Sequence, residues 1–272
     1  MTATTATEQP QSAAFPGRLR KELAYIFTPR KRMIQIVVKM RDLPGALSGI
    51  LSLLGTRVNL VSCTAYYDDE EGATFSGFAE PLDTCEKPAF LEKTIESSPS
   101  VLGCKVIEGS DGILVDSFHT GIETQAGEPL LFLRWNALNQ MFDNLVKVFG
   151  SGGEVMLYYE GLSMGESNAR EVAGKLGRDA FMRNVPSILR MHSAAGWGAA
   201  SIVGQEASGA PVVRIENCFE CSTRQRIRHE CSFVKGLLAG VAEVAFGSEA
   251  VCVETKCRFK GDPHCEFSIR AG

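Results

Sequence analysis

The sequence has no long apolar run and no excess of positive charge. None of its 272 residues lies in a stretch of the roughly 18 apolar residues that a membrane-spanning helix needs. Residues 1–17 lack the basic and then apolar order that is typical of a secretory signal. We therefore expect a cytoplasmic protein without membrane contact. A net charge of -4 gives no broad attraction for phosphates, so we expect no direct nucleic-acid binding.

The sequence also lacks the motifs of cofactor-dependent catalysis. It contains no dinucleotide-binding fingerprint, no flavin-binding loop and no recognisable pair of nucleophile and base. We therefore assign no catalytic residue and expect a binding protein rather than an enzyme.

Length and composition predict a folded protein of two domains. A chain of this length exceeds the usual single domain of about 100 to 200 residues. Hydrophobic residues make up 44% and charged residues 22%, which is typical of globular proteins. Both domains are expected to be α+β.

The first domain is expected over residues 31–108, after a flexible basic arm over residues 1–30. Within the arm, the apolar residues 23–27 favour a short helix before Pro29. The following pattern predicts strand 33–40, helix 46–55, strands 58–69 and 73–80, helix 88–97 and strand 101–109. This βαββαβ order is that of a ferredoxin-like domain. Residues 109–129 have no sustained period and several glycines, so we place the connector there.

The second domain is expected over residues 130–272. Apolar spacing predicts a helix over 134–150, and a β-rich run predicts a strand over 152–162. A helical stretch over 167–196 is expected to break at Pro186. Two strands around 207–210, a helix over 229–247 and a hairpin turning at 261–263 complete the domain.

Clustered cysteines point to a metal site. Six of the nine cysteines fall between Cys218 and Cys265, which does not suit a secreted disulfide framework. Cys231 would lie in the first turn of its helix, and Glu254, Cys257 and Cys265 on the two arms of the hairpin. Three thiolates and a carboxylate suit zinc, and four protein ligands make the site structural rather than catalytic. Strand alternation puts Glu254 and Cys257 on opposite faces, so a twist or bulge must reconcile them.

Several alternatives remain for these residues. Buried cysteines can act as small hydrophobic residues without any metal. His264, beside Cys265, would give a Cys₃His site in place of Glu254. The CxxC of Cys218 and Cys221 can be a redox pair or half of a zinc knuckle, although buried thiols without either role are expected.

The C-terminal half resembles the 4-vinyl reductase, or hydrocarbon-binding, domain family. The resemblance covers about residues 130–270 and rests on the cysteine that opens a glycine-containing helix, the E-x-x-C strand, and the Gly-Asp-Pro turn before Cys-x-Phe. The segments 161–165 and 196–198 add to it. It implies a dimeric α/β ligand-binding fold with zinc near a closed apolar pocket. In phenol-sensing activators of this family the matching Cys, Glu, Cys and Cys hold zinc, which favours Glu254 over His264.

The first domain resembles the ACT family of regulatory modules. The resemblance rests on the sequence DLPG at 42–45, followed by the helix and the strand that begins near Val58. It implies pairing of chains, with an amino acid bound near the turn after the first strand. The positions carried over for such an effector are Asp42, Gly45 and Asn59.

These features favour a small-molecule sensor that binds a hydrophobic or aromatic ligand. His192 is the polar group expected to orient the ligand in an apolar pocket. Without an ATPase or helix-turn-helix segment, a homodimer would act through a protein partner. The alternatives are an enzyme or accessory protein for a tetrapyrrole vinyl group, and a zinc-stabilised structural adaptor. The candidate pocket residues are Trp135, Phe142, Phe181, His192 and Trp197.

Overall fold

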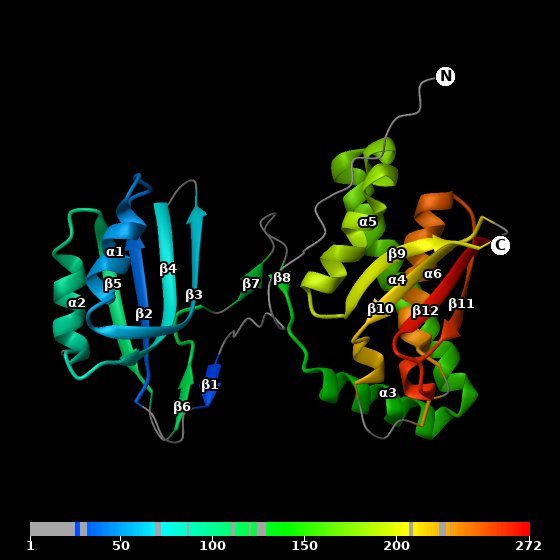
Figure 1. Cartoon of the computed structure of the whole chain (residues 1–272), viewed down its shortest axis with the longest axis horizontal. Coiled ribbons are helices and arrows are strands. Elements are labelled where there is room, and N and C mark those ends of the chain that lie inside the picture. The colour runs from blue at the N-terminus through cyan, green and yellow to red at the C-terminus, as the bar shows by residue number, and fades with distance from the viewer. Residues whose placement is uncertain are drawn as a thin grey trace. The chain divides into compact units, whose positions relative to one another are not determined.

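The computed structural model divides the chain into two units, residues 1–130 and 131–272. It describes residues 25–27, 32–68, 72–85, 87–109, 112–119, 121–123, 129–206, 209–222, 227–228 and 230–272. Most of the predicted basic arm therefore lies outside the described residues. The elements of both units are labelled in Figure 1.

A four-stranded antiparallel sheet forms the first unit. Its strand order is β3 (Val58–Asp68), β4 (Gly72–Pro81), β2 (Ile34–Met40) and β5 (Val101–Glu108). The β-branched run of β2 alternates along the strand, so Ile34, Ile36 and Val38 are buried on one face. The element order of residues 34–108 is the predicted βαββαβ.

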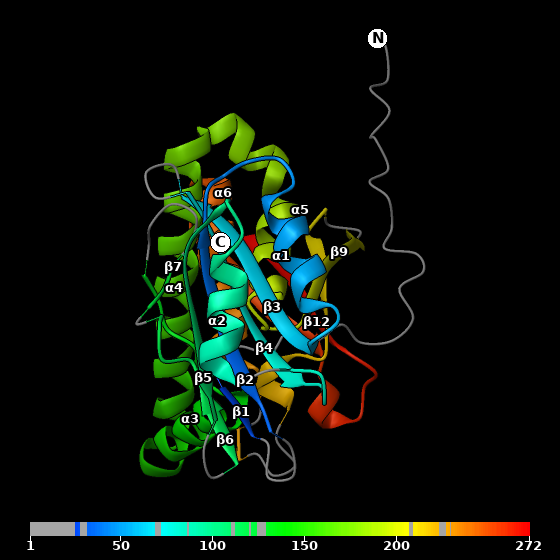
Figure 2. The same cartoon turned by 90° about the vertical axis from the view of Figure 1, so that its left-hand side faces the viewer.

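Two helices cover this face of the sheet. Helix α1 (Ala46–Leu54) follows Gly45, whose φ of 88° lies in the left-handed region that glycine favours. Helix α2 (Pro88–Glu96) begins with a proline, which is suited to the first helical position. Ile50 of α1 and Leu91 of α2 join the β2 side chains in one core. Figure 2 shows both helices in front of the strands.

Short strands flank this sheet. β1 (Tyr25–Phe27) pairs with β6 (Ile113–Val115), and β7 (Ile122–Glu123) pairs with β8 (Pro129–Leu130). The prediction of a helix around residues 23–27 is therefore wrong for 25–27. The partner strand β6 supplies backbone hydrogen bonds that local propensity could not anticipate.

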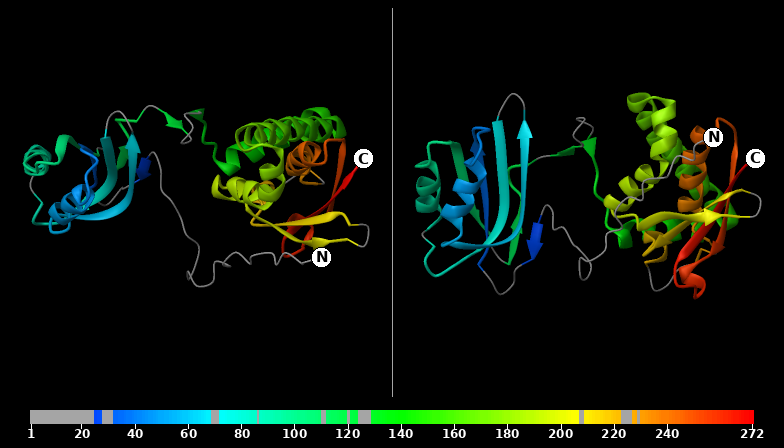
Figure 3. Two further views of the ribbon diagram at one scale, coloured as in Figure 1. Left: turned by 90° about the horizontal axis from the view of Figure 1, so that it is seen from above. Right: turned by 45° about the horizontal axis from the view of Figure 1, so that its top comes forward.

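The second unit packs helices on one face of a second antiparallel sheet. The strand order is β11 (Ala250–Lys256), β12 (Cys265–Ala271), β10 (Pro211–Glu216) and β9 (Ala199–Gln205). The helices are α3 (Trp135–Phe149), α4 (Ser151–Leu176), α5 (Arg178–Ala194) and α6 (Ser232–Phe246). Helix α6 packs against α4 and against β11 and β12. Figure 3 shows the helices on one side and the sheet on the other.

Residues 152–162 belong to helix α4, so the prediction of a strand there is wrong. Gly161 and Gly165 of α4 face Gly236 and Gly240 of α6. A Cβ at Gly161 would lie 2.0 Å from the Phe233 carbonyl oxygen, and one at Gly236 would lie 1.9 Å from that of Tyr158. The two backbones therefore meet at a distance that only glycine allows. This tertiary packing outweighs the strand propensity of the local sequence.

The predicted helix break at Pro186 is also wrong. Helix α5 continues through Pro186, and the break lies at Gly177, whose φ is 79°. Phe181 before the proline and Ile188 after it are both buried, so packing on both sides holds the helix together. Among the described residues, no helix is both long and apolar enough to cross a membrane.

Candidate functional site

Cys231 provides the helical part of a buried cysteine cluster. It is the N-cap residue of α6 and has no exposed surface. Its carbonyl oxygen accepts a hydrogen bond from Lys235 N–H at 2.8 Å, as an N-cap should. The partial positive charge of a helix N-terminus favours a thiolate at this position.

The β11–β12 hairpin provides Glu254, Cys257 and Cys265. The pairing of the two strands shifts between Glu254 and Lys256, which is the irregularity that strand alternation required. Glu254 Oε2 accepts a hydrogen bond from Cys231 N–H at 3.1 Å. Glu254 Oε1 is buried and has no hydrogen-bond partner within the described part of the chain. Burial raises the pKa of Glu254 to about 8. A cation at Oε1 would satisfy this oxygen and favour the carboxylate.

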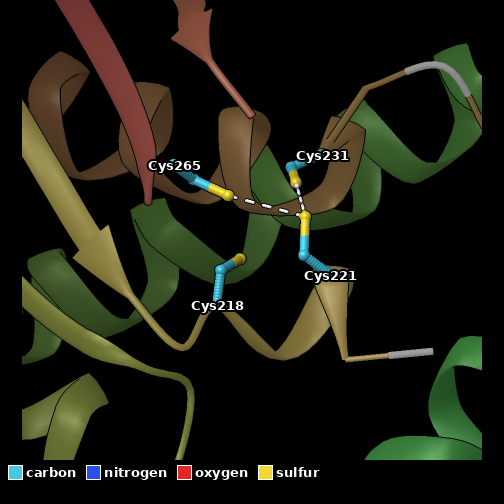
Figure 4. A group of neighbouring side chains, drawn as sticks. All are labelled: Cys218, Cys221, Cys231 and Cys265. Carbon is cyan, nitrogen blue, oxygen red and sulfur yellow. Dashed lines mark hydrogen bonds between the residues drawn. The ribbon is translucent and has the colours of Figure 1, made fainter. Parts of the chain in front are cut away.

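Cys218 and Cys221 complete the cluster from a direction that the sequence reasoning did not assign. They flank the 3₁₀ turn η1 (Phe219–Cys221), which follows β10. The sulfur of Cys221 lies 3.2 Å from that of Cys231, 3.6 Å from that of Cys257 and 3.5 Å from that of Cys265. Hydrogen bonds from Cys218 and then Cys231 hold the pKa of Cys221 far below its ordinary value. In Figure 4 the four drawn thiols point toward one another.

Two groups of four donors can be drawn from these residues. One consists of Cys218, Cys221, Cys231 and Cys265, and the other of Cys231, Glu254, Cys257 and Cys265. In each group all donor atoms lie within 4.8 Å of one another. Zn–S bonds of about 2.3 Å place the sulfurs of a tetrahedral site about 3.8 Å apart. The donor types and their spacing therefore fit a zinc-type ion.

Two nearby candidates stand outside both groups. The Nε2 atom of His264 lies 3.4 Å from Glu266 Oε2, and His264 is in neither donor group. Cys252 is also in neither group, and burial raises the pKa of its thiol. The second zinc ligand set predicted as an alternative, with His264 in place of Glu254, is therefore not the one that the side chains form.

A buried ion-pair network fixes the CxxC turn to helix α6. Glu220, which lies between the two cysteines, accepts hydrogen bonds from Val234 N–H at 2.9 Å and Phe233 N–H at 3.4 Å. Arg228 pairs with Glu220 at 3.5 Å and with Asp143 of α3 at 3.0 Å, and both Glu220 and Arg228 are fully buried side chains. The carboxylate thus satisfies free N–H groups of the first helical turn, which an N-terminus favours.

A small apolar cavity adjoins the same helix. Its volume is about 20 Å³. His192 is the one titratable side chain among the described residues that line it. Burial lowers the pKa of His192 and favours the neutral ring. Nδ1 lies 3.0 Å from the Ile188 carbonyl, so Nδ1 carries the proton, and Nε2 lies 3.3 Å from Asn168 Nδ2. The lining residues are Leu189, His192, Trp197, Gly198, Ala200, Ile215, Val234, Leu237 and Leu238.

The predicted pocket residues separate into three places. His192 and Trp197 line the cavity together, with ring centroids 6.1 Å apart. Phe142 packs against Phe219 and Phe233, and Trp135 lies at the edge of the same core. Phe181 belongs to a different cluster. The cavity residues that sequence reasoning missed are aliphatic core positions, which helical spacing alone cannot distinguish from other core residues.

The predicted effector residues of the first unit do not converge within one chain. Asp42 and Gly45 follow the end of β2, whereas Asn59 lies at the start of β3. Asn59 pairs with Glu80, beside Ala79, which in turn pairs with Ile34 at the start of β2. Because β2 and β3 run in the same direction, Asn59 lies at the opposite end of the sheet from Asp42. The three-residue site is therefore wrong as a site within one chain.

Comparison with known proteins places a family match on the cysteine cluster. Residues 211–271 match the 4-vinyl reductase domain. All the donors, from Cys218 to Cys265, lie within the matched residues. An uncharacterized protein of Methanocaldococcus jannaschii is 26% identical over 131 residues, which is 47% of this chain and 71% of that protein. A second one from the same organism is 29% identical over 123 residues, 44% of this chain and 66% of its own length.

Among solved structures, the phenol-responsive sensory domain of the transcription activator PoxR, determined with phenol, is similar with a TM-score of 0.44. Its sequence identity is 18%, and the match covers 53% of this chain and 78% of that one. A likeness at this level does not transfer a ligand.

Proposed function

We propose that this protein is a non-enzymatic sensor whose second unit binds a small, largely apolar molecule beside a structural zinc site. The observation that carries the proposal is that one helix serves both features. Cys231 caps α6, and Val234 and Leu237, one and two turns further on, line the apolar cavity. A molecule that displaces α6 would act on the metal ligands as well.

The zinc part of the proposal rests on the chemistry of the donors. Cys231, Glu254, Cys257 and Cys265 come from three elements that are distant in sequence, so an ion held by them would link α6 to both arms of the hairpin. Four protein ligands leave no position for a reactive water, which is typical of a structural site. Zinc would then contribute to the folding free energy of the second unit.

Replacing Cys257 tests this assignment. Cys257→Ser should lower the bound zinc, measured by elemental analysis, and lower the unfolding temperature. Cys104→Ser is the matched control, because Cys104 is a buried cysteine of the first unit. Equal zinc in Cys257→Ser and the wild type would remove Cys257 from the ligand set.

The ligand part of the proposal rests on the chemistry of the cavity. About 20 Å³ is room for one water molecule, so an aromatic ligand must open the cavity as it binds. Its aliphatic walls suit an apolar body, and His192 Nε2 can accept one hydrogen bond from a hydroxyl in place of the long contact with Asn168. A cavity of this size does not favour a tetrapyrrole substrate.

Phenol and toluene are suitable probes because they differ in one hydroxyl group. The sequence has two tryptophans, so Trp135→Phe leaves Trp197 in the cavity wall as the sole reporter. In this background phenol should quench Trp197 fluorescence with about tenfold higher affinity than toluene, since a hydrogen bond contributes about 1 kcal/mol. His192→Leu should abolish this preference. No response to either probe at millimolar concentration would leave the structural adaptor.

We propose that the first unit pairs chains or binds a second effector, such as an amino acid, near the turn of Asp42 and Gly45. Output would then pass to a protein partner. Native mass spectrometry of the purified protein reports zinc, retained small molecules and subunit number in one measurement. A zinc-free monomer with no retained molecule would contradict the sensor as proposed.

A further inference from the structure

The cysteine cluster contains more donors than one tetrahedral ion uses. The two donor groups share Cys231 and Cys265 and together comprise five thiols and one carboxylate. A four-coordinate ion leaves two of these six donors over, whichever group holds it. Two four-coordinate ions need six donors if they share two. The number of donors and the identity of the shared pair both match that arrangement.

We propose that the site is binuclear, with two zinc-type ions bridged by the thiolates of Cys231 and Cys265. Cys218 and Cys221 are the terminal ligands of one ion, and Glu254 and Cys257 are those of the other. The inference rests on the proposed function for the presence of metal, and goes beyond it in the number of ions and in the role of the CxxC.

The turn that carries the CxxC is built to present both thiols to one centre. Asn217 follows β10 with a φ of 51°, and is the one non-glycine residue with positive φ in the described ranges. This turns the chain directly into η1, where Cys221 N–H donates to the Cys218 carbonyl at 3.1 Å. A 3₁₀ turn has about three residues per turn, so side chains three positions apart point the same way. Glu220 and Arg228 then hold the turn against α6.

Charge balance does not oppose the second ion. One divalent ion held by three thiolates and one carboxylate leaves a net charge of about -2. The second divalent ion ionises Cys218 and Cys221, whose two protons pass to solvent, and brings two positive charges. The buried site therefore keeps the same net charge when the second ion binds. An iron–sulfur cluster fits less well, because inorganic sulfide and iron would separate thiols that here lie in contact.

The number of ions per chain tests the inference on the full-length protein. Protein purified without chelator from zinc-supplemented cells should contain two zinc ions per chain by elemental analysis and native mass spectrometry. The double variant Cys218→Ser with Cys221→Ser should retain one. Cys252→Ser should retain two, because Cys252 is a buried thiol of β11 outside both donor groups.

Cadmium-113 NMR gives a second readout that does not depend on comparing variants. The cadmium-substituted wild type should give two resonances of equal intensity, and the double serine variant one. One zinc ion and one cadmium resonance in the wild type would overturn the binuclear site while leaving the zinc part of the proposed function intact. A chain without metal would overturn both, and iron with acid-labile sulfide would also overturn the inference.

Discussion

The contact between α4 and α6 gives a sharp prediction, because it lies next to the metal donors. A Cβ at Gly161 would lie 2.0 Å from the carbonyl oxygen of Phe233 and 2.9 Å from Leu237 N. Both atoms belong to the α6 backbone, so no side chain can rotate away. Gly161→Ala must push the helices apart, and Phe233 lies two residues beyond Cys231.

The magnitude follows from two opposing effects. Overpacking a core costs about 1 to 3 kcal/mol or more, and alanine recovers up to about 1 kcal/mol of helix propensity relative to glycine. A clash with backbone belongs at the upper end, so we expect a net loss of about 2 to 3 kcal/mol. For a unit of this size, that loss lowers Tm by about 6 to 12 °C. Bound zinc should also become easier to remove with a chelator.

Gly174 provides a control within the same helix. It is an exposed residue of α4, and a Cβ there would meet nothing within 4 Å. Gly174→Ala should therefore raise the stability by about 0.5 to 1 kcal/mol. Thermal unfolding followed by circular dichroism measures both variants. Equal unfolding temperatures for the two variants would refute the close contact between the helices.

Three further predictions concern the second unit. Because burial lowers the pKa of His192, the unfolded chain binds a proton below about pH 6.5 that the folded chain does not, so stability should fall with decreasing pH by at most about 1.4 kcal/mol per unit. Urea unfolding at pH 7.5 and 5.5 should show this slope, and His192→Gln but not His264→Gln should reduce it. Arg228→Met should cost about 3 to 5 kcal/mol by leaving Glu220 with an unpaired buried charge, whereas the exposed Arg170→Met should cost less than about 1 kcal/mol; similar urea midpoints would contradict the network. Residues 131–272 alone should fold and bind zinc, and an insoluble or zinc-free fragment would show that this unit depends on the first.

Local pattern was sufficient where an element's own residues determine its structure. The β-branched run of β2, the left-handed turn at Gly45 and the apolar spacing of α1 predicted their elements within a few residues. The need for a bulge beside Glu254 also followed from strand alternation alone, and the strand pairing contains it. Such features require only that side chains alternate in a strand or repeat in a helix.

Prediction from sequence was wrong where a distant segment decides the structure. The run of Val155, Leu157 and Tyr159 has the composition of a strand, but Gly161 and Gly165 become meaningful only when paired with Gly236 and Gly240. The helix-breaking tendency of Pro186 is likewise outweighed by buried residues on both sides of it. Asn59 was misplaced because its distance from Asp42 depends on strand order and not on sequence separation.

The CxxC shows most clearly why the spacing of ligands in sequence is an incomplete guide to a metal site. Cys218 and Cys221 have the spacing of half a zinc site, but no second CxxC follows them. Their partners are supplied by the N-cap of α6 and by one hairpin, which meet the turn only after α6 has packed against the sheet. The cluster therefore depends on the position of α6, and so does the cavity wall at Val234 and Leu237. Any ligand whose binding shifts α6 changes the affinity for metal, and by thermodynamic reciprocity the metal changes the affinity for that ligand by the same factor.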